Sequence, residues 1–246
     1  QLIVSAKTAD GVTLDVTRLA KITAGSGAVE VLGGGLVQAR TDGATALTVA
    51  LAGKTVNVPV NVSGTAEVFH PDYIRDVNPV LTRLGCNQGT CHGAKDGKNG
   101  FKLSLRGYDP IYDHRALTDD IGARRINRAA PDQSLMLLKA SGSIPHVGGV
   151  RTDVGQPYYE LVRSWISQGL KLDLNAPRVA KIDVLPLNPI VPLPGMKQQI
   201  AVMATFTNGE VRDVTREAFI ESGNIEVIEA GPSGILNTLR RGEAPV

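Results

Sequence analysis

The chain of 246 residues contains the stretch Asp10-Gly11-Val12-Thr13-Leu14-Asp15-Val16-Thr17-Arg18, and repeats it as Asn208-Gly209-Glu210-Val211-Arg212-Asp213-Val214-Thr215-Arg216. Between residues 1–29 and 199–227, 12 of 29 positions hold the same residue. Asp-Gly and Asn-Gly are hairpin signals, and the short runs around them alternate between apolar and polar residues. The repeat therefore predicts a small β-sandwich at each end of the chain.

The two copies of the repeat are cut at different places. Alternating runs extend the first copy through residues 46–62, and further apolar runs precede the second copy over residues 179–193. We expect a sandwich over residues 1–65 that is incomplete at its N-terminal side, and one over residues 177–246 that is incomplete at its C-terminal side. Either the chain is a piece of a longer protein, or neighbouring copies complete one another. Missing strands would leave open sheet edges.

The composition excludes several classes of function. The net charge is +2 with acids and bases interspersed, so no basic stripe indicates nucleic acid. No apolar stretch reaches the roughly 18 residues that a membrane span needs. The chain has two cysteines, both in one short segment, so no disulfide framework links the domains. Aromatic residues make up only 4% of the chain, which leaves room for a non-protein apolar group in one core.

Residues 66–176 differ from both copies of the repeat. Apolar residues at helical spacing predict helices over residues 71–84, 131–139 and 157–168, and Pro79 should kink or split the first. Trp165, on the apolar face of the third helix, is expected to pack in the core. We therefore predict a multidomain chain of α and β class, with a central all-α domain between two β-sandwiches.

The central segment contains Cys86-Asn87-Gln88-Gly89-Thr90-Cys91-His92. Cys-x-x-Cys-His attaches haem c: two thiols add to the haem vinyl groups, and the adjacent imidazole binds the iron. Here the cysteines are five positions apart instead of three, so two extra residues must loop outward for both thiols to reach one haem. Gly89 suits such a loop because glycine adopts conformations closed to other residues.

Three other interpretations of this motif stay open on spacing alone. The thiols of Cys86 and Cys91 could form a disulfide that closes a short loop. They could bind zinc with His92 and a fourth ligand, although structural zinc sites usually draw on two separated ligand pairs. They could also form a redox dithiol, for which Cys-x-x-Cys is the usual spacing.

The residues after the motif continue a longer pattern. It includes Gly97-Lys98-Asn99-Gly100-Phe101, Arg124-Arg125-Ile126-Asn127, Pro145-His146-Val147-Gly148-Gly149 and Trp165-Ile166-Ser167-Gln168-Gly169. This pattern resembles the planctomycete-type cytochrome c domain, and the two repeats resemble bacterial immunoglobulin-like group 2 domains. That cytochrome family is found beside such domains in large secreted proteins. The resemblance implies one covalent haem c, a role in electron transport, and a location outside the cytoplasm, in the periplasm or at the cell surface.

The resemblance also assigns the iron ligands. Ordinary cytochrome c supplies a methionine from the loop before its last helix, often as Met-Pro-x-Gly-Gly. The matching loop here has histidine in place of that sulfur ligand, which implies His92 as the proximal and His146 as the distal ligand of the iron. Arg124 and Arg125 are candidate partners of the haem propionates, because a guanidinium group pairs with carboxylates in a fork. Further candidates are Lys102, Arg106 and Arg151.

Two filled axial positions predict an electron carrier and not an enzyme. Its partner would be a redox protein or another domain of the same longer chain. Two alternatives stay open: a small-ligand sensor or peroxidase-like enzyme if His146 leaves the iron open, and a zinc-stabilised binding module if no haem is attached. Met136 and His114 are the next candidates for the sixth ligand; His114 lies in a polar run and is otherwise expected in solvent.

Overall fold

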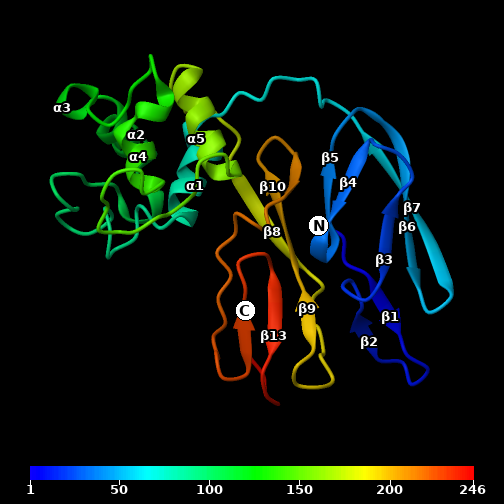
Figure 1. Cartoon of the computed structure of the whole chain (residues 1–246). Helices are drawn as coiled ribbons and strands as arrows, with labels where there is room; N and C mark the ends of the chain where they lie inside the picture. Colours follow the sequence, from blue (N-terminus) through cyan, green and yellow to red (C-terminus); the bar gives the residue numbers. More distant parts are fainter. The chain divides into compact units, whose positions relative to one another are not determined.

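The structure, a computed structural model, describes all 246 residues and divides them into two compact units (Figure 1). The repeat unit consists of Gln1–Val68 together with Val179–Val246, so both copies of the repeat belong to it. The inserted unit is Phe69–Arg178. None of the helices combines the length and the apolar character needed to cross a bilayer.

The prediction of an all-α central domain is wrong. Strands dominate the chain, and helical residues make up only 20% of it, with five short α-helices. Most of the inserted unit lies in turns and loops, and Lys98 and Phe101 form an isolated antiparallel bridge. The stretch from Gly85 to Gly107 holds several residues with positive φ, which interrupt any helix. They are Gly85, Gly97, Asn99, Gly100, Arg106 and Gly107.

The repeat unit contains strands from both copies, in small antiparallel sheets. The first copy forms the hairpin β1 (Ser5–Lys7) and β2 (Thr13–Asp15), the pair β4 (Val29–Leu32) and β5 (Leu36–Ala39), and a sheet in the order β3 (Lys21–Ala24), β6 (Gly43–Leu51) and β7 (Lys54–Val62). The second copy forms a sheet in the order β11 (Val211–Asp213), β10 (Ala201–Phe206) and β8 (Val179–Leu185), and another in the order β12 (Ile228–Ala230), β13 (Ile235–Thr238) and β9 (Lys197–Gln199).

Strand pairing repeats together with the sequence. In the β1–β2 hairpin Ser5 lies opposite Asp15, and in the β10–β11 hairpin Met203 lies opposite Asp213, which is the same register 198 residues later. The pairs β4–β5 and β12–β13 also share one register, with the offset increased by one residue. The repeated hairpin signals therefore specify the same local structure twice.

One glycine in each copy is required by close packing of the backbone. Gly35 has a φ of +80°, and a Cβ there would lie 2.4 Å from Leu2 O. Gly234 has a φ of +77°, and a Cβ there would lie 2.6 Å from Ile200 O. In the first copy Leu2 N donates to Gly35 O at 2.7 Å, and in the second copy Ile200 N donates to Gly234 O at 2.8 Å. Any side chain at either position would break this contact.

The two copies bind each other through equivalent residues. The backbone nitrogen of Gln199 donates to Asp15 Oδ2 at 2.5 Å, and the nitrogen of Gln1 forms the matching contact with Asp213. Arg18 Nη2 adds a hydrogen bond of 2.8 Å to Gln199 Oε1. Each copy thus donates a hydrogen bond to an aspartate carboxylate of the other copy. These reciprocal bonds help to hold the two copies together in one compact unit.

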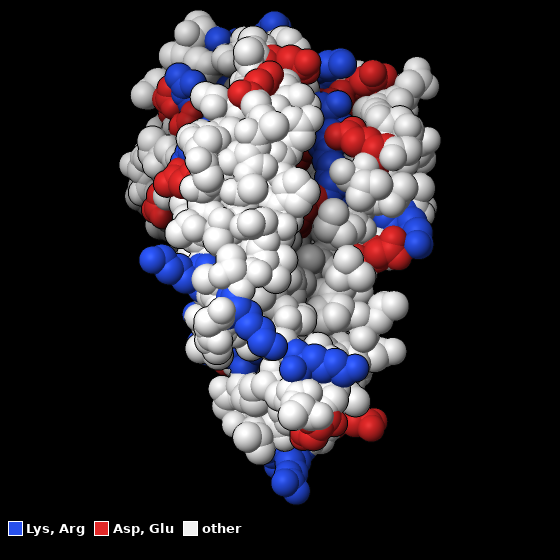
Figure 2. Space-filling model, turned by 90° about the vertical axis from the view of Figure 1, so that its right-hand side faces the viewer, with Lys and Arg blue, Asp and Glu red and all other residues white.

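Charged side chains are scattered over the repeat unit and leave wide uncharged areas. On the side that carries β6 and β7 in Figure 1, Figure 2 shows acids and bases interspersed around a broad uncharged surface. From Gly43 to Val62 these two strands and their turn contain a single charged residue, Lys54. The mixed charge agrees with a net charge of only +2.

Proline residues set the first turn of most helices of the inserted unit. The helical segments are the π-helical turn η2 (Tyr73–Val77), α1 (Asn78–Arg83), η3 (Leu105–Gly107), α2 (Pro110–Thr118), α3 (Asp120–Ala123), η4 (Pro131–Gln133), α4 (Leu135–Ala140) and α5 (Pro157–Ser167). The first and third predicted helices are confirmed within their ranges. The second, predicted over residues 131–139, consists of the turn η4, an extended Ser134 and the helix α4, which ends one residue later at Ala140. Pro79 lies in the first turn of α1, directly after η2, and the backbone at Val77 and Asn78 stays helical. The first helix therefore changes from π to α form at this point and is not split.

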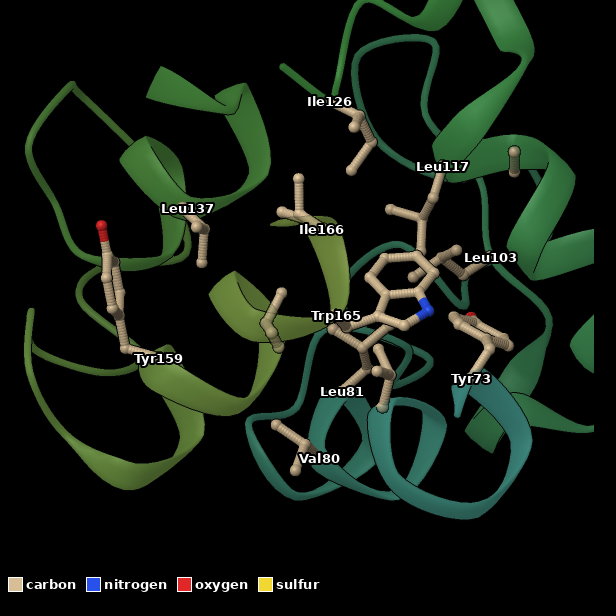
Figure 3. Close-up of a cluster of buried hydrophobic side chains, with 13 residues drawn as sticks. Tyr73, Val80, Leu81, Leu103, Leu117, Ile126, Leu137, Tyr159, Trp165 and Ile166 are labelled. Carbon is tan, nitrogen blue, oxygen red and sulfur yellow. The ribbon is translucent and has the colours of Figure 1, made fainter. Parts of the chain in front are cut away.

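Trp165 of α5 lies at the centre of the core of the inserted unit, as predicted (Figure 3). Its side chain is fully buried, its indole nitrogen donates to Lys171 O at 3.0 Å, and its ring lies 5.4 Å from that of Tyr73. His114 is not in solvent, contrary to expectation. Its Nε2 lies 2.9 Å from Leu170 O, and its ring packs edge-on against Tyr73, because the polar run around it forms α2 and turns this side chain inward.

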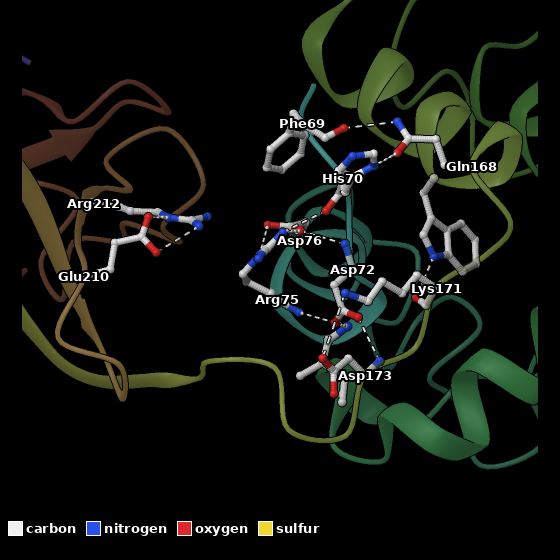
Figure 4. A network of polar contacts seen from close by, with 12 residues as sticks. Phe69, His70, Asp72, Arg75, Asp76, Gln168, Lys171, Asp173, Glu210 and Arg212 are labelled. Atoms are coloured by element: carbon white, nitrogen blue, oxygen red, sulfur yellow. Dashed lines mark hydrogen bonds and ion pairs between the residues drawn. The ribbon is translucent and has the colours of Figure 1, made fainter. Parts of the chain in front are cut away.

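The first and last segments of the inserted unit are joined by hydrogen bonds (Figure 4). Tyr73 N donates to Lys171 O at 3.0 Å, and Asp173 N donates to Asp72 Oδ2 at 2.8 Å. Asp72 is buried and also caps η2, because its Oδ1 accepts from Ile74 N at 2.9 Å. Nearby, Gln168 Nε2 donates to Phe69 O at 3.0 Å. These bonds hold the two ends of the unit side by side.

Candidate functional site

The Cys-x4-Cys-His motif forms a closed loop after α1. His92 N donates to Cys86 O at 3.0 Å, and Cys91 N donates to Gln88 O at 2.9 Å. Gly89 and Thr90 are exposed at the tip of the loop, while Asn87 is buried beneath it. The two extra residues therefore project outward, as the five-residue spacing predicts, and the loop bond returns His92 to Cys86.

The glycine that this loop needs is Gly93 and not Gly89. Gly89 has no positive φ, and a Cβ there would meet only Leu105 Cδ1, at an ordinary 3.7 Å. A Cβ at Gly93 would lie 2.0 Å from Asn87 O and 2.9 Å from Gln88 O. The expectation that Gly89 supplies the conformational freedom is thus corrected: crossing of the backbone at Gly93 closes the loop.

Cys86 and Cys91 are free thiols, so the disulfide interpretation is not realised in this structure. Burial raises the pKa of Cys86 to about 11, with Arg151 acting in the opposite direction. The Cys86 thiol is therefore protonated at neutral pH. The chain has no group of three or more His, Cys, Asp or Glu side chains arranged to hold a metal ion, so the geometry gives the zinc interpretation no support.

His92 is oriented by a backbone carbonyl. Its Nδ1 lies 3.0 Å from Phe101 O, and its ring leans against the Phe101 ring at 4.5 Å. Burial lowers the pKa of His92, the bond to Phe101 O opposes this shift, and His146 and Arg125 lower the pKa further. A neutral imidazole with its proton on Nδ1 keeps the lone pair of Nε2 for a metal.

His146 faces His92 from the loop between α4 and α5. Its Nδ1 lies 2.9 Å from Gly149 O, so this ring too is held through Nδ1. The two ring centres are 6.4 Å apart, and the ring planes differ by only 7°. The parallel rings are thus stacked with room for a group between them, and an imidazole nitrogen binds a first-row metal at about 2.0–2.1 Å.

Gly148 leaves the space that the His146 ring occupies. A Cβ at Gly148 would lie 2.9 Å from His146 Cε1 and 3.2 Å from Nε2. Gly148 has no positive φ, so its backbone alone would accept another residue. The glycine is required by the imidazole beside it.

A cavity of about 940 Å³ lies between the motif loop and the loop of His146. Its walls are mostly apolar and come from α1, the Phe101 segment, α4 and α5; both cysteines and both histidines lie on them. Five basic residues line the cavity, and no Asp or Glu does. The basic residues are Lys98, Arg124, Arg125, Lys139 and Arg151.

The two arginines expected at haem propionates have different surroundings. Arg125 is buried, its Nη1 donates to Ala116 O at 2.9 Å, and its Nη2 donates to Gly100 O at 3.2 Å. Its guanidinium group also lies over the Phe101 ring, 4.2 Å from the ring centre. Arg125 therefore braces the segment that holds His92, whereas Arg124 is exposed at the cavity wall.

Several site residues carried no decisive signal in the sequence. Lys98 and Lys139 join Arg124 at the cavity, and isolated bases like these look the same as surface bases in a sequence. Arg151, a candidate partner of the propionates from the sequence, also lines the cavity, whereas the candidates Lys102 and Arg106 do not. Met136 lines the cavity and packs against the core.

Comparison with known proteins adds no family assignment. No protein-family model matches the chain, and no curated protein shows significant sequence similarity to it. The function is therefore argued from the motif and from the geometry of the cavity.

Proposed function

We propose that the inserted unit is a c-type cytochrome: one haem attached covalently to Cys86 and Cys91, with His92 and His146 as axial ligands. The observation that carries this proposal is the pair of nearly parallel imidazole rings 6.4 Å apart, each fixed through Nδ1. A porphyrin supplies four of the six iron ligands, so two opposed imidazoles complete the set. The family resemblance of the surrounding residues supports the same assignment.

The cavity suits a flat, largely apolar group with two carboxylates. Its volume of about 940 Å³ is at the upper end of the roughly 300–1,000 Å³ range of ligand pockets. Apolar walls would cover the ring system, and four basic residues would pair with the propionates: Lys98, Arg124, Lys139 and Arg151. The absence of acidic side chains from the walls favours an anionic ligand.

The cysteines can form the attachment without an oxidant. In each thioether the S–H bond breaks, the sulfur bonds to one vinyl carbon, and the hydrogen goes to the other. Cys86 holds its proton for this addition, because its raised pKa keeps it a thiol. The exposed tip at Gly89 and Thr90 takes up the two extra residues, so both thiols remain on the wall of one cavity.

The proposed role is electron transfer. When bound, the haem supplies an iron that cycles between Fe(III) and Fe(II). His92 and His146 would hold the iron in both states, and filling both axial positions would leave no place for a substrate. We place the chain outside the cytoplasm, with a redox protein or another domain of a longer chain as its partner and the immunoglobulin-like repeats as a scaffold.

Covalent attachment should depend on both cysteines. Protein produced in cells that mature haem c should keep its haem in acidified organic solvent. Cys86→Ala and Cys91→Ala should each keep one thioether and shift the alkaline pyridine spectrum, and the double variant should lose all haem on extraction. Full extraction of haem from the unchanged protein would contradict the attachment.

The Gly148→Ala change should weaken the binding of His146 to the iron while leaving the imidazole side chain itself unaltered. Overpacking of this kind costs about 1–3 kcal/mol, so binding of His146 to iron should fall about 5- to 150-fold. Carbon monoxide titration of the reduced protein measures this loss. Gly89→Ala is the matched control, since its Cβ meets only an ordinary contact; equal behaviour of the two variants would refute the positioning role of Gly148.

A further inference from the structure

Arg125 is a buried cation on the cavity wall that forms no ion pair. The residue is only 6% exposed, and the ion pairs of the inserted unit are all made by other residues. Its guanidinium group donates to two backbone carbonyls, Ala116 O and Gly100 O, and lies over the ring of Phe101. All three contacts are neutral, and the cavity beside them is lined by no Asp or Glu. The positive charge is therefore not neutralised by any neighbouring side chain.

Hydrogen bonding alone does not account for a charge at this position. Ala116 lies in the last turn of α2, where carbonyls lack partners within the helix, and a neutral amide side chain could donate to it equally well. A cation removed from water loses solvation, so burying one without an acidic partner is costly. Burial lowers the pKa of Arg125, with Asp120 acting in the opposite direction, but an arginine keeps its charge at neutral pH.

The charge lies close to the proposed proximal ligand. Arg125 Cζ is 4.2 Å from the centre of the Phe101 ring, and the centre of the His92 ring is 4.5 Å from the same point. Phe101 O also holds His92 Nδ1 at 3.0 Å. One residue thus contacts both the guanidinium group and the imidazole. At about 10 Å and an effective dielectric constant of about 20, one unit charge changes an equilibrium that alters a second charge about tenfold.

We propose that Arg125 raises the reduction potential of the haem iron through its buried charge. This inference rests on the proposed function. On reduction one electron passes from the redox partner to the iron, no bond forms or breaks, and the charge of the haem centre falls by one. A fixed positive charge disfavours the state of higher charge, so Arg125 favours Fe(II). It thereby offsets part of the lower potential that histidine gives in place of methionine as an axial ligand.

The test measures the reduction potential of the haem-loaded full chain by spectroscopic redox titration. Arg125→Gln keeps a side-chain N–H donor but removes the charge. At a fixed potential near the midpoint its ratio of Fe(II) to Fe(III) should fall about tenfold, a shift of about 59 mV for a one-electron couple. Arg125→Met, which keeps an apolar stem, should shift the potential in the same direction. Arg125→Lys keeps the charge and loses the planar fork, so its ratio should stay within about threefold of the parent.

Arg115→Gln is the matched control, because it removes one positive charge from an exposed position on α2 of the same unit. Water and salt screen such a charge, so the ratio should change less than about twofold. The effect of Arg125→Gln should persist in about 1 M salt, where exposed charges are screened within about 3 Å. Urea unfolding of each haem-free variant checks that it folds, and the methionine and lysine variants complete the comparison if the glutamine variant does not.

Two results would overturn the inference while leaving the proposed function in place, provided that the spectra remain low-spin. One is an unchanged potential on removal of the charge at Arg125. The other is an equal shift in the lysine and the neutral variants, which is what a merely structural role predicts. A parent protein that takes up no haem would instead refute the proposed function, and this inference with it.

Discussion

Replacing His146 by alanine should convert a low-spin haem protein that does not bind carbon monoxide into one that binds it readily. The expected change follows from the geometry, because no other histidine lies on the cavity wall opposite His92. The reduced parent should keep a spectrum with sharp α and β bands in the presence of carbon monoxide. The reduced His146→Ala variant should be five-coordinate and should change its spectrum at once on addition of the gas.

Two further variants make this result specific. His114→Ala should leave the spectrum low-spin, since that side chain is committed to Leu170 O and the core. His146→Met should raise the potential if the sulfur reaches the iron, because thioether ligation favours Fe(II). An unchanged low-spin spectrum in His146→Ala would assign the sixth ligand elsewhere, and Met136 on the same cavity would be tested next.

The Gly93→Ala change should lower the free energy of unfolding more than any other glycine-to-alanine change in the inserted unit. Its Cβ would lie 2.0 Å from Asn87 O, a backbone atom that cannot move without opening the motif loop. Opening the loop breaks the bond from His92 N to Cys86 O and separates the residues of the candidate site. We expect a loss of about 4 kcal/mol or more, the range of exceptional single mutations, measured by urea unfolding.

The same loop provides the control for this prediction. Gly89→Ala adds a methyl group three residues before His92 and meets only the side chain of Leu105. It should change the free energy of unfolding by no more than about 0.5 kcal/mol, as exposed substitutions usually do. Similar losses in Gly89→Ala and Gly93→Ala would mean that the loop is not closed by the crossing at Gly93.

Much of the repeat unit could be predicted from the sequence, because its signals are local. Asp10-Gly11 and Asn208-Gly209 specify tight turns, and alternation of side chains sets the register on either side. The reciprocal bonds of Asp15 and Asp213 could not be predicted, since each joins segments separated by the entire inserted unit. Sequence order separates the two copies of the repeat and gives no sign that they belong to one compact unit.

The inserted unit was harder to predict because tertiary contacts determine its loops. Periodicity identified α1, α4 and α5, but the helix α2 was overlooked, although Asp109-Pro110 is a helix start and Asp109 Oδ1 caps Tyr112 N at 3.0 Å. The segment from Gly85 to Gly107 contains positive-φ residues such as Arg106, whose conformation no local rule demands. These loops account for the failure of the all-α prediction.

In the candidate site, too, residues with a local sequence signal could be predicted, and residues placed by tertiary contacts could not. The motif brought Cys86, Cys91 and His92 to attention, and the loop resemblance added His146, because these residues have fixed sequence spacing. Arg125 could be named but its two backbone partners could not, since Ala116 and Gly100 meet it only in the folded unit. Geometry was needed to separate an arginine that braces the site from one that faces the cavity.

The hydrogen bonds that join the two ends of the inserted unit also affect how the repeats find each other. Phe69 is bonded to Gln168, and Asp72 to Asp173, so the two ends of the folded insertion lie close together. For the two copies of the repeat, the folded insertion is therefore equivalent to a short connecting segment. Loop closure costs about 0.6 kcal/mol for each doubling of length, so a link of about ten effective residues in place of about a hundred favours assembly of the repeats by roughly 2 kcal/mol. Unfolding of the insertion would lengthen that connection, so a change that unfolds the inserted unit should destabilise the repeat unit as well.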